Sequence, residues 1–276
     1  MIIRIQCSDR VGLVAAVSDI LAKNAMNIES MREFVDKEAG KFFLRVTTDK
    51  EPASDKLAGQ LQEALPEKAS IDISRKSRDK KVVILVTKEY HCLSDILTRN
   101  HFNTLGAKVQ AVIGNHEILQ DICDRFNIPF TYISHEGKNK EAFEKELKEK
   151  IQSYSFDYIV LAKFMRILSD EFVAAFPYRI INIHHSFLPA FIGASPYRQA
   201  FERGVKLIGA TAHFVTSLLD EGPIIEQQII RINHTYSPGD MIVAGKEIET
   251  SVLAKALSLV FEDRVFVSNN KTVVFD

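Results

Sequence analysis

Short, continuous apolar runs separated by longer amphipathic stretches are the feature that most constrains the fold of this chain. These runs are residues 82–87, 109–113, 158–162 and 180–183. A strand that is apolar on both faces is typical of a parallel sheet with helices on both sides. We therefore predict a doubly wound α/β domain, extended by paired strands at 207–215 and 224–232 and closed by a long helix over 240–261.

Residues 1–74 show a different pattern. Ile3 and Ile5 alternate with polar residues, whereas Leu13, Val17 and Leu21 recur at helical spacing. The full order is strand, helix, strand, strand, helix, strand, which is typical of a ferredoxin-like α+β fold. A polar, charged stretch at 75–80 has no apolar periodicity and predicts a linker. We therefore expect one domain at 1–74 and a second at 81–276.

Charge and cysteine usage exclude several classes of protein. The 276 residues include 35 basic and 36 acidic side chains, which gives a net charge of −1 and no electrostatic reason to bind nucleic acid or an anionic membrane. No apolar run approaches the roughly 20 residues of a membrane span, and the N-terminus does not resemble a signal peptide. Cys7, Cys92 and Cys123 lack metal-ligand spacing. We expect a cytoplasmic protein with reduced thiols, no bound metal and no cofactor.

Three polar residues next to the predicted strands suggest catalysis. Asn182 and His184 are two positions apart, so they face the same side at the C-terminal end of a strand, where open α/β sheets bind ligands. Asp220 lies on a turn just before the apolar run at 224–232. An amide and an imidazole can stabilise a tetrahedral oxyanion and protonate a leaving nitrogen, and a carboxylate can hold the imidazolium. By the same alternation His185 is predicted to point away from His184, which leaves no paired metal ligands.

The first domain resembles an ACT domain, a small regulatory module. The resemblance rests on Asp9-Arg10-Val11-Gly12-Leu13, where the first strand turns into the first helix, and on Asn27 at the start of the second strand. It implies either pure subunit assembly or a site for a small amino acid at Asp9, Gly12 and Leu13. In such a site the ligand carboxylate would lie at the helix N-terminus and its amine near Asn27. Open sheet edges in either case predict a homo-oligomer.

The second domain resembles the formyltransferase catalytic domain that uses 10-formyltetrahydrofolate, which is Rossmann-like. Three motifs in order carry the resemblance: Phe164-Met165-Arg166-Ile167-Leu168, Asn182-Ile183-His184-His185-Ser186-Phe187-Leu188-Pro189 and Leu219-Asp220-Glu221-Gly222-Pro223-Ile224-Ile225. The resemblance implies that Asn182, His184 and Asp220 are catalytic. It also implies that Met165, Arg166, Ile167 and Leu168 hold the folate pterin, largely through backbone groups.

The acceptor of the formyl group is indicated by the segment after the first strand of this domain. Residues 87–94 contain no glycine and include Glu89, so they are poorly suited to bind a phosphate. The whole chain resembles the formyltetrahydrofolate deformylase family, which transfers the formyl group to water. The resemblance implies hydrolysis of 10-formyltetrahydrofolate to tetrahydrofolate and formate, and a role in one-carbon balance and formate supply for purine synthesis. Two alternatives stay open: a formyltransferase acting on a small amine, and a non-catalytic folate and amino-acid sensor.

Overall fold

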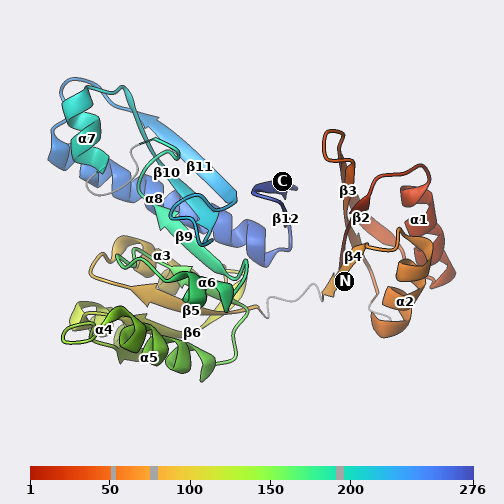
Figure 1. Cartoon of the computed structure of the whole chain (residues 1–276), viewed down its shortest axis with the longest axis horizontal. Helices are drawn as coiled ribbons and strands as arrows, with labels where there is room; N and C mark the ends of the chain where they lie inside the picture. Colours follow the sequence, from red (N-terminus) through yellow and green to blue (C-terminus); the bar gives the residue numbers. More distant parts are fainter. Residues whose placement is uncertain (51–53, 75–79, 191–195) are drawn as a thin grey trace. The chain divides into compact units, whose positions relative to one another are not determined.

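The computed structural model describes residues 1–50, 54–74, 80–190 and 196–276, and the chain forms two compact units (Figure 1). The first unit comprises Met1–Ser77, Glu262–Phe266 and Val273–Asp276, and the second comprises Arg78–Phe261 and Val267–Thr272. Of the predicted linker, residues 75–79 lie outside the described residues, and Lys80 is the first residue of a strand. The last residues of the chain therefore group with the first unit, whereas the sequence division assigned them to the second.

The first unit has the predicted ferredoxin-like order of elements. They are β1 (Ile2–Ser8), α1 (Leu13–Lys23), β2 (Ile28–Asp36), β3 (Lys41–Thr48), α2 (Ser54–Ala64) and β4 (Ser70–Ser74). The sheet order is β2-β3-β1-β4, with every neighbouring pair antiparallel. Ile3 and Ile5 of β1 are fully buried in one apolar core with Val17 and Leu21 of α1 and Leu61 of α2. The strand alternation and the helical spacing in the sequence thus meet in a single core.

The opposite side of this sheet is covered by the end of the chain. Phe42 of β3 packs into the helix-side core, whereas the adjacent Phe43 packs against Phe266 and Phe275. The Arg45 side chain donates hydrogen bonds to the carbonyls of Glu262 and Asp263. Phe266 lies on β12 (Val265–Ser268), and Phe275 follows β13 (Lys271–Val274); the sequence analysis did not predict this two-stranded sheet.

The second unit is the predicted doubly wound domain. Its elements are β5 (Lys80–Val86), α3 (His91–His101), β6 (Ala107–Gly114), η1 (Glu117–Leu119), α4 (Gln120–Arg125), β7 (Phe130–Tyr132), α5 (Lys140–Gln152), β8 (Tyr158–Leu161), α6 (Asp170–Ala174), β9 (Ile180–His184), α7 (Pro196–Arg203), β10 (Leu207–Phe214), β11 (Ile224–Arg231) and α8 (Pro238–Phe261). The sheet order is β11-β10-β9-β8-β5-β6-β7. Strands β5 to β9 are parallel, and β10 and β11 run antiparallel at one end. The strand order reverses between β5 and β8, and the ends of these strands mark the crevice in which such folds bind ligands.

Helices cover both faces of this sheet, as the apolar runs predict. Val83 and Leu85 of β5 pack in one core with Phe143 of α5 and Phe172 of α6. On the other face α8 packs along β10 and β11 and against α3 (Figure 1). None of the described helices is long and apolar enough to cross a membrane.

Candidate active site

The candidate active site is built where β9 ends, and strand register decides which side chains meet there. Asn182 and His184 lie on β9, and the antiparallel pairing with β10 places them opposite His213 and Thr211. The Thr211 hydroxyl donates to the Ser186 carbonyl at 2.8 Å and so holds the chain that follows β9 against β10. The end of β9 is therefore a braced part of the sheet rather than a free loop.

Asp220 reaches His184 through a tight turn before β11. His184 Nδ1 lies 3.3 Å from Asp220 Oδ2, and both side chains are largely buried. Asp220 has a φ of 56°, and a Cβ on Gly222 would lie 1.7 Å from the Phe214 carbonyl oxygen, so only glycine allows the turn to pack this closely on β10. His184 Nε2 is buried and has no hydrogen-bond partner among the described residues. Asp220 therefore orients His184 so that one ring nitrogen is available to a substrate.

His213 orients Asn182, a contact that the sequence analysis missed. His213 Nδ1 donates to the Phe214 carbonyl at 2.9 Å, and Nε2 lies 3.2 Å from Asn182 Nδ2. Burial lowers the pKa of His213, so Nε2 of the neutral ring accepts a hydrogen from the Asn182 amide. The second amide hydrogen of Asn182 remains available. The position of His213 opposite Asn182 depends on the β9–β10 register, which the sequence analysis did not predict.

The charges of this group favour an ionised Asp220. Burial alone would raise the pKa of Asp220, but the hydrogen bond from His184 and the charge of that ring hold it below its usual range. His213 Nε2 lies 3.8 Å from Asp220 Oδ1, so the carboxylate lies between two imidazoles. The Asp220 carboxylate therefore contacts the ring that the sequence analysis assigned as the acid for a leaving nitrogen.

His185 differs from its predicted orientation. The rings of His184 and His185 have centroids 5.2 Å apart and planes at 33°, so they lie side by side and do not point to opposite faces. The strand ends at His184, and the period-two rule no longer applies to the next residue. Burial and the charge of Lys163 lower the pKa of His185 to about 4, so its ring is neutral near pH 7. His185 also faces Tyr197, with ring centroids 6.0 Å apart.

Residues 164–168 form an irregular loop directly after β8. The Met165 N–H donates to the Thr87 hydroxyl at 2.9 Å, which ties the start of the loop to the end of β5. The Glu144 carboxylate accepts from the N–H and the hydroxyl of Ser169, which holds the other end. Met165 and Ile167 are 57% and 62% exposed, an unusual state for apolar side chains at a sheet crevice. The loop is thus anchored at both ends and apolar on its exposed side.

A pocket of about 340 Å³ lies against this loop. It is lined by Lys140, Phe143, Glu144, Met165, Arg166, Ile167 and Leu168. All four loop residues predicted to hold the pterin therefore line one cavity, together with side chains of α5. Mixed apolar and polar groups of this kind are typical of small-molecule sites.

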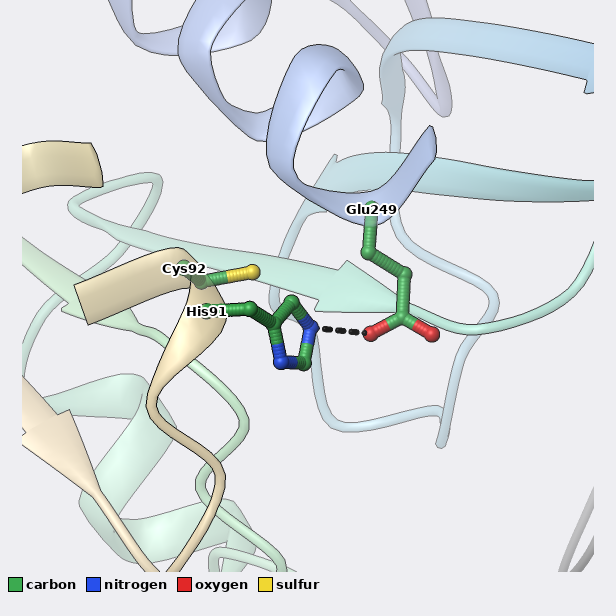
Figure 2. A group of neighbouring side chains, drawn as sticks. All are labelled: His91, Cys92 and Glu249. Atoms are coloured by element: carbon green, nitrogen blue, oxygen red, sulfur yellow. Dashed lines mark hydrogen bonds and ion pairs between the residues drawn. The ribbon is translucent and has the colours of Figure 1, made fainter. Parts of the chain in front are cut away.

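A second buried polar group surrounds Glu249 on α8. Glu249 Oε2 accepts from His91 Nε2 at 2.9 Å and lies 3.0 Å from Lys163 Nζ, while the Tyr197 hydroxyl donates to Oε1 at 2.6 Å. We call His91, Lys163, Tyr197 and Glu249 the Glu249 cluster. Figure 2 shows the imidazole of His91 and the carboxylate of Glu249 pointing toward one another from α3 and α8, with Cys92 beside them.

The residues around Glu249 include a possible metal-ligand set, His91, Cys92 and Glu249. The charge of Lys163, however, lies at the same carboxylate oxygen that His91 contacts. Burial raises the pKa of the Cys92 thiol far above its usual value, so it stays protonated. A metal ion would have to displace a buried ammonium and ionise this thiol, so the donor set does not fit a resident metal.

The predicted effector residues lie in the first unit, apart from this chemistry. Gly12 has a φ of 91° and precedes α1, and nothing lies within 4 Å of where its Cβ would be. The glycine is therefore required by backbone conformation rather than by close packing. The Asp9 N–H bonds to the Gly40 carbonyl, the Leu13 side chain is buried in the core, and the Asn27 N–H bonds to the Asp49 carboxylate.

Comparisons with known protein families agree with the fold of each unit. Residues 80–257 match the formyl transferase family and residues 1–59 match the ACT domain. A crystal structure of glycinamide ribonucleotide transformylase 1 from Symbiobacterium toebii superposes with a TM-score of 0.70 at 29% identity, covering 74% of this chain and 98% of that one. Fold and site thus define an ACT-containing member of the formyl transferase class.

Relatives that match over nearly the full length of the chain identify one family within this class. A formyltetrahydrofolate deformylase from Haemophilus influenzae is 50% identical over 268 residues, which cover 97% of this chain and 96% of the relative. A crystal structure of a formyltetrahydrofolate deformylase from Pseudomonas syringae pv. tomato superposes with a TM-score of 0.95 at 39% identity, covering 100% of this chain and 94% of that one. The chain therefore belongs to the formyltetrahydrofolate deformylase family.

Proposed function

We propose that this chain hydrolyses 10-formyltetrahydrofolate to tetrahydrofolate and formate. One observation carries the proposal: Asp220 and His213 orient His184 and Asn182 so that a ring nitrogen and an amide hydrogen remain available beside one another at the end of β9. This is the donor arrangement that an oxyanion formed from an amide requires. The identity of the full-length relatives supports the same reaction.

The reaction begins when water attacks the formyl carbon on the N10 nitrogen of the folate. Asp220, ionised because its pKa is lowered, accepts the proton from the water directly or by sustaining the imidazolium of His184. Asn182 and His184 donate hydrogen bonds to the tetrahedral oxyanion. The C–N bond then breaks, His184 protonates N10, and formate and tetrahydrofolate leave. We assign no step to a cofactor.

The 164–168 loop and its pocket hold the pterin in this proposal. Met165, Arg166, Ile167 and Leu168 line the cavity at the end of β8, and the loop is fixed by Thr87 and Glu144. Irregular backbone offers unpaired N–H and carbonyl groups, which match the donors and acceptors of a pterin ring. Side chains then supply apolar contact and the backbone supplies specificity.

The ACT unit regulates or assembles the enzyme in this proposal. The first turn of α1, which follows the exposed turn at Asp9–Gly12, offers N–H groups to the carboxylate of a small amino acid, with Asn27 nearest its amine. The outer strands β2 and β4 are sheet edges, which favour a homo-oligomer. Calorimetry against the common amino acids tests the effector site, and light scattering at micromolar concentration tests the homo-oligomer.

We place the enzyme in the cytoplasm, in keeping with its three free cysteines.

The deciding experiment is to incubate the pure protein with 10-formyltetrahydrofolate and no amine, and to assay both products. We expect formate and tetrahydrofolate in equal amounts. Turnover that requires an added amine would instead support the formyltransferase alternative. Tight folate binding without any turnover would support the sensor alternative. Either outcome would remove the proposal.

A further inference from the structure

We infer that the Glu249 cluster forms the acceptor-side wall of the active site and thereby restricts the acceptor of the formyl group to water. The inference rests on the proposed function and adds to it the reason for the choice of acceptor. The four residues of the Glu249 cluster are positioning residues, because they act by filling space and by holding one another rather than by contacting the folate.

The cluster closes the space above the ends of three parallel strands. Lys163 lies two residues after the end of β8 and has a φ of 63°, and His91 opens α3 after β5. Tyr197 lies in α7, the first helix after β9, and Glu249 projects from α8. The ends of β5, β8 and β9 form the ligand crevice in folds of this kind, so these four side chains converge where a second substrate would enter.

Packing around the cluster leaves little free volume. Glu249 is 1% exposed, and the side chains of Lys163 and His91 are nearly as buried. A Cβ on Gly245 would lie 2.1 Å from the Tyr197 hydroxyl oxygen, so this ring is seated directly on the backbone of α8. The cluster is therefore a packed element and not a set of mobile surface side chains.

The charges of the cluster are satisfied internally. Burial alone would raise the pKa of Glu249, but the hydrogen bond from His91 and the charge of Lys163 lower it to about 2, so the carboxylate is ionised. Lys163 balances this charge, and His91 and Tyr197 donate to the same group. Buried charges that are fully paired hold one another in place. The ammonium of Lys163 is thus engaged and does not attract an acidic acceptor.

His185 connects this wall to the reacting groups. Its ring lies 5.2 Å from that of His184 and 6.0 Å from that of Tyr197, and Lys163 and Glu249 both act on it electrostatically. The wall is therefore one side chain away from His184. Water needs only the space beside His184, whereas we expect the substituents of an amine to extend toward the cluster and to meet His91 and Tyr197. A steric block of this kind excludes a competing substrate without improving binding of the correct one.

The test measures how the formyl group divides between water and an added amine. Wild type and variants are incubated with 10-formyltetrahydrofolate and excess glycinamide, a small primary amine. Tetrahydrofolate reports total turnover, formate reports hydrolysis, and N-formylglycinamide is measured by mass spectrometry. We expect wild type to release formate and tetrahydrofolate one to one. His91→Ala should raise the yield of N-formylglycinamide above the wild-type background by roughly tenfold or more, as expected when at least one methylene of steric exclusion is lost.

A second variant and a control separate specificity from stability. The double variant Lys163→Met with Glu249→Gln loosens the cluster by another route and leaves no unpaired ion. It should shift the division in the same direction. Cys92→Ala removes the buried thiol beside His91 and Glu249 but leaves the hydrogen bonds and the ion pair of the cluster in place, and its products should divide as in wild type.

Three outcomes would overturn the inference. The first is formylation of glycinamide by wild type, and the second is release of formate and tetrahydrofolate one to one by the folded variants, as a purely structural cluster would give. Wild type that releases no formate with or without amine would remove the proposed function as well, so the two failures are distinguishable.

Discussion

His184 Nδ1 and Asp220 Oδ2 lie 3.3 Å apart, although 35 residues separate them in the chain. The pairing leaves His184 Nε2 buried and free for a substrate, and it keeps Asp220 ionised. The chemistry of the site therefore depends on this contact more than on either residue alone.

Asp220→Asn should abolish most turnover while preserving the shape of the site. The amide cannot sustain an imidazolium at His184, so we expect kcat to fall by about 10²-fold or more. The KM for the folate should change little, because Asp220 is not part of the 164–168 loop. Formate-release kinetics measure both constants. Asp121→Asn, which removes an exposed carboxylate paired with Arg125, is the control and should behave as wild type. Near-normal formate release by Asp220→Asn would exclude the assigned role.

His213→Phe should lower kcat through Asn182. The phenyl ring fills similar space but cannot accept the Asn182 amide hydrogen, so the amide loses its orientation. We expect a fall of about tenfold, against about 10²–10³ for Asn182→Ala. Because the two residues act through one contact, the double variant should resemble Asn182→Ala alone. Effects that multiply would show that His213 acts independently of Asn182.

Backbone recognition by the 164–168 loop predicts an order of effects. Ile167→Pro removes an N–H and restricts Arg166, so it should raise the KM for the folate more than Arg166→Ala does. Ile167 is 62% exposed, so the change removes little core packing. Ile167→Ala keeps the N–H and serves as the matched control, with a small expected effect. A larger effect from Arg166→Ala would show that its side chain reads the pterin.

The neutral, half-buried ring of His185 predicts a loss of stability in mild acid. Its pKa is lowered to about 4 in the folded chain, from about 6.5 for an unperturbed histidine. The unfolded chain therefore takes up this proton at the higher pH. The stabilising contribution is complete above about pH 6.5 and is lost as the pH falls through about 4. Urea denaturation across this range should show a shallower decline for His185→Gln than for wild type. His101→Gln, at an exposed histidine, is the control and should follow the wild-type slope.

Two glycines in the first unit should respond to alanine in opposite directions. Neither has an atom within 4 Å of its missing Cβ, so packing does not distinguish them. Gly12 has a φ of 91°, and Gly12→Ala should destabilise the unit by about 1–2 kcal/mol. Gly59 lies within α2, and Gly59→Ala should stabilise the unit by about 0.5–1 kcal/mol. The free energy of unfolding from denaturant titration measures both changes, and equal signs would contradict the backbone explanation.

Local patterns in the sequence were sufficient to predict both folds. Ile3 and Ile5 alternate because only one face of β1 meets the helices, whereas Val83 and Leu85 lie in a continuous apolar run because β5 is covered on both faces. The same period of two placed Asn182 and His184 together on β9. These predictions succeed because strand geometry is set by neighbouring residues.

The sequence by itself determined the strands of the two larger sheets, the position of Asn182 and His184 on one strand, and the loop that lines the pocket. Only the tertiary structure decided which distant groups complete the site. His213 reaches Asn182 through the β9–β10 register, and Glu249 meets Lys163 because α8 packs back over the sheet. The orientation of His185 and the packing of Phe266 on the first unit were decided in the same way. Contacts of this kind depend on strand register, chain reversal and burial over long sequence separations, which local periodicity does not encode.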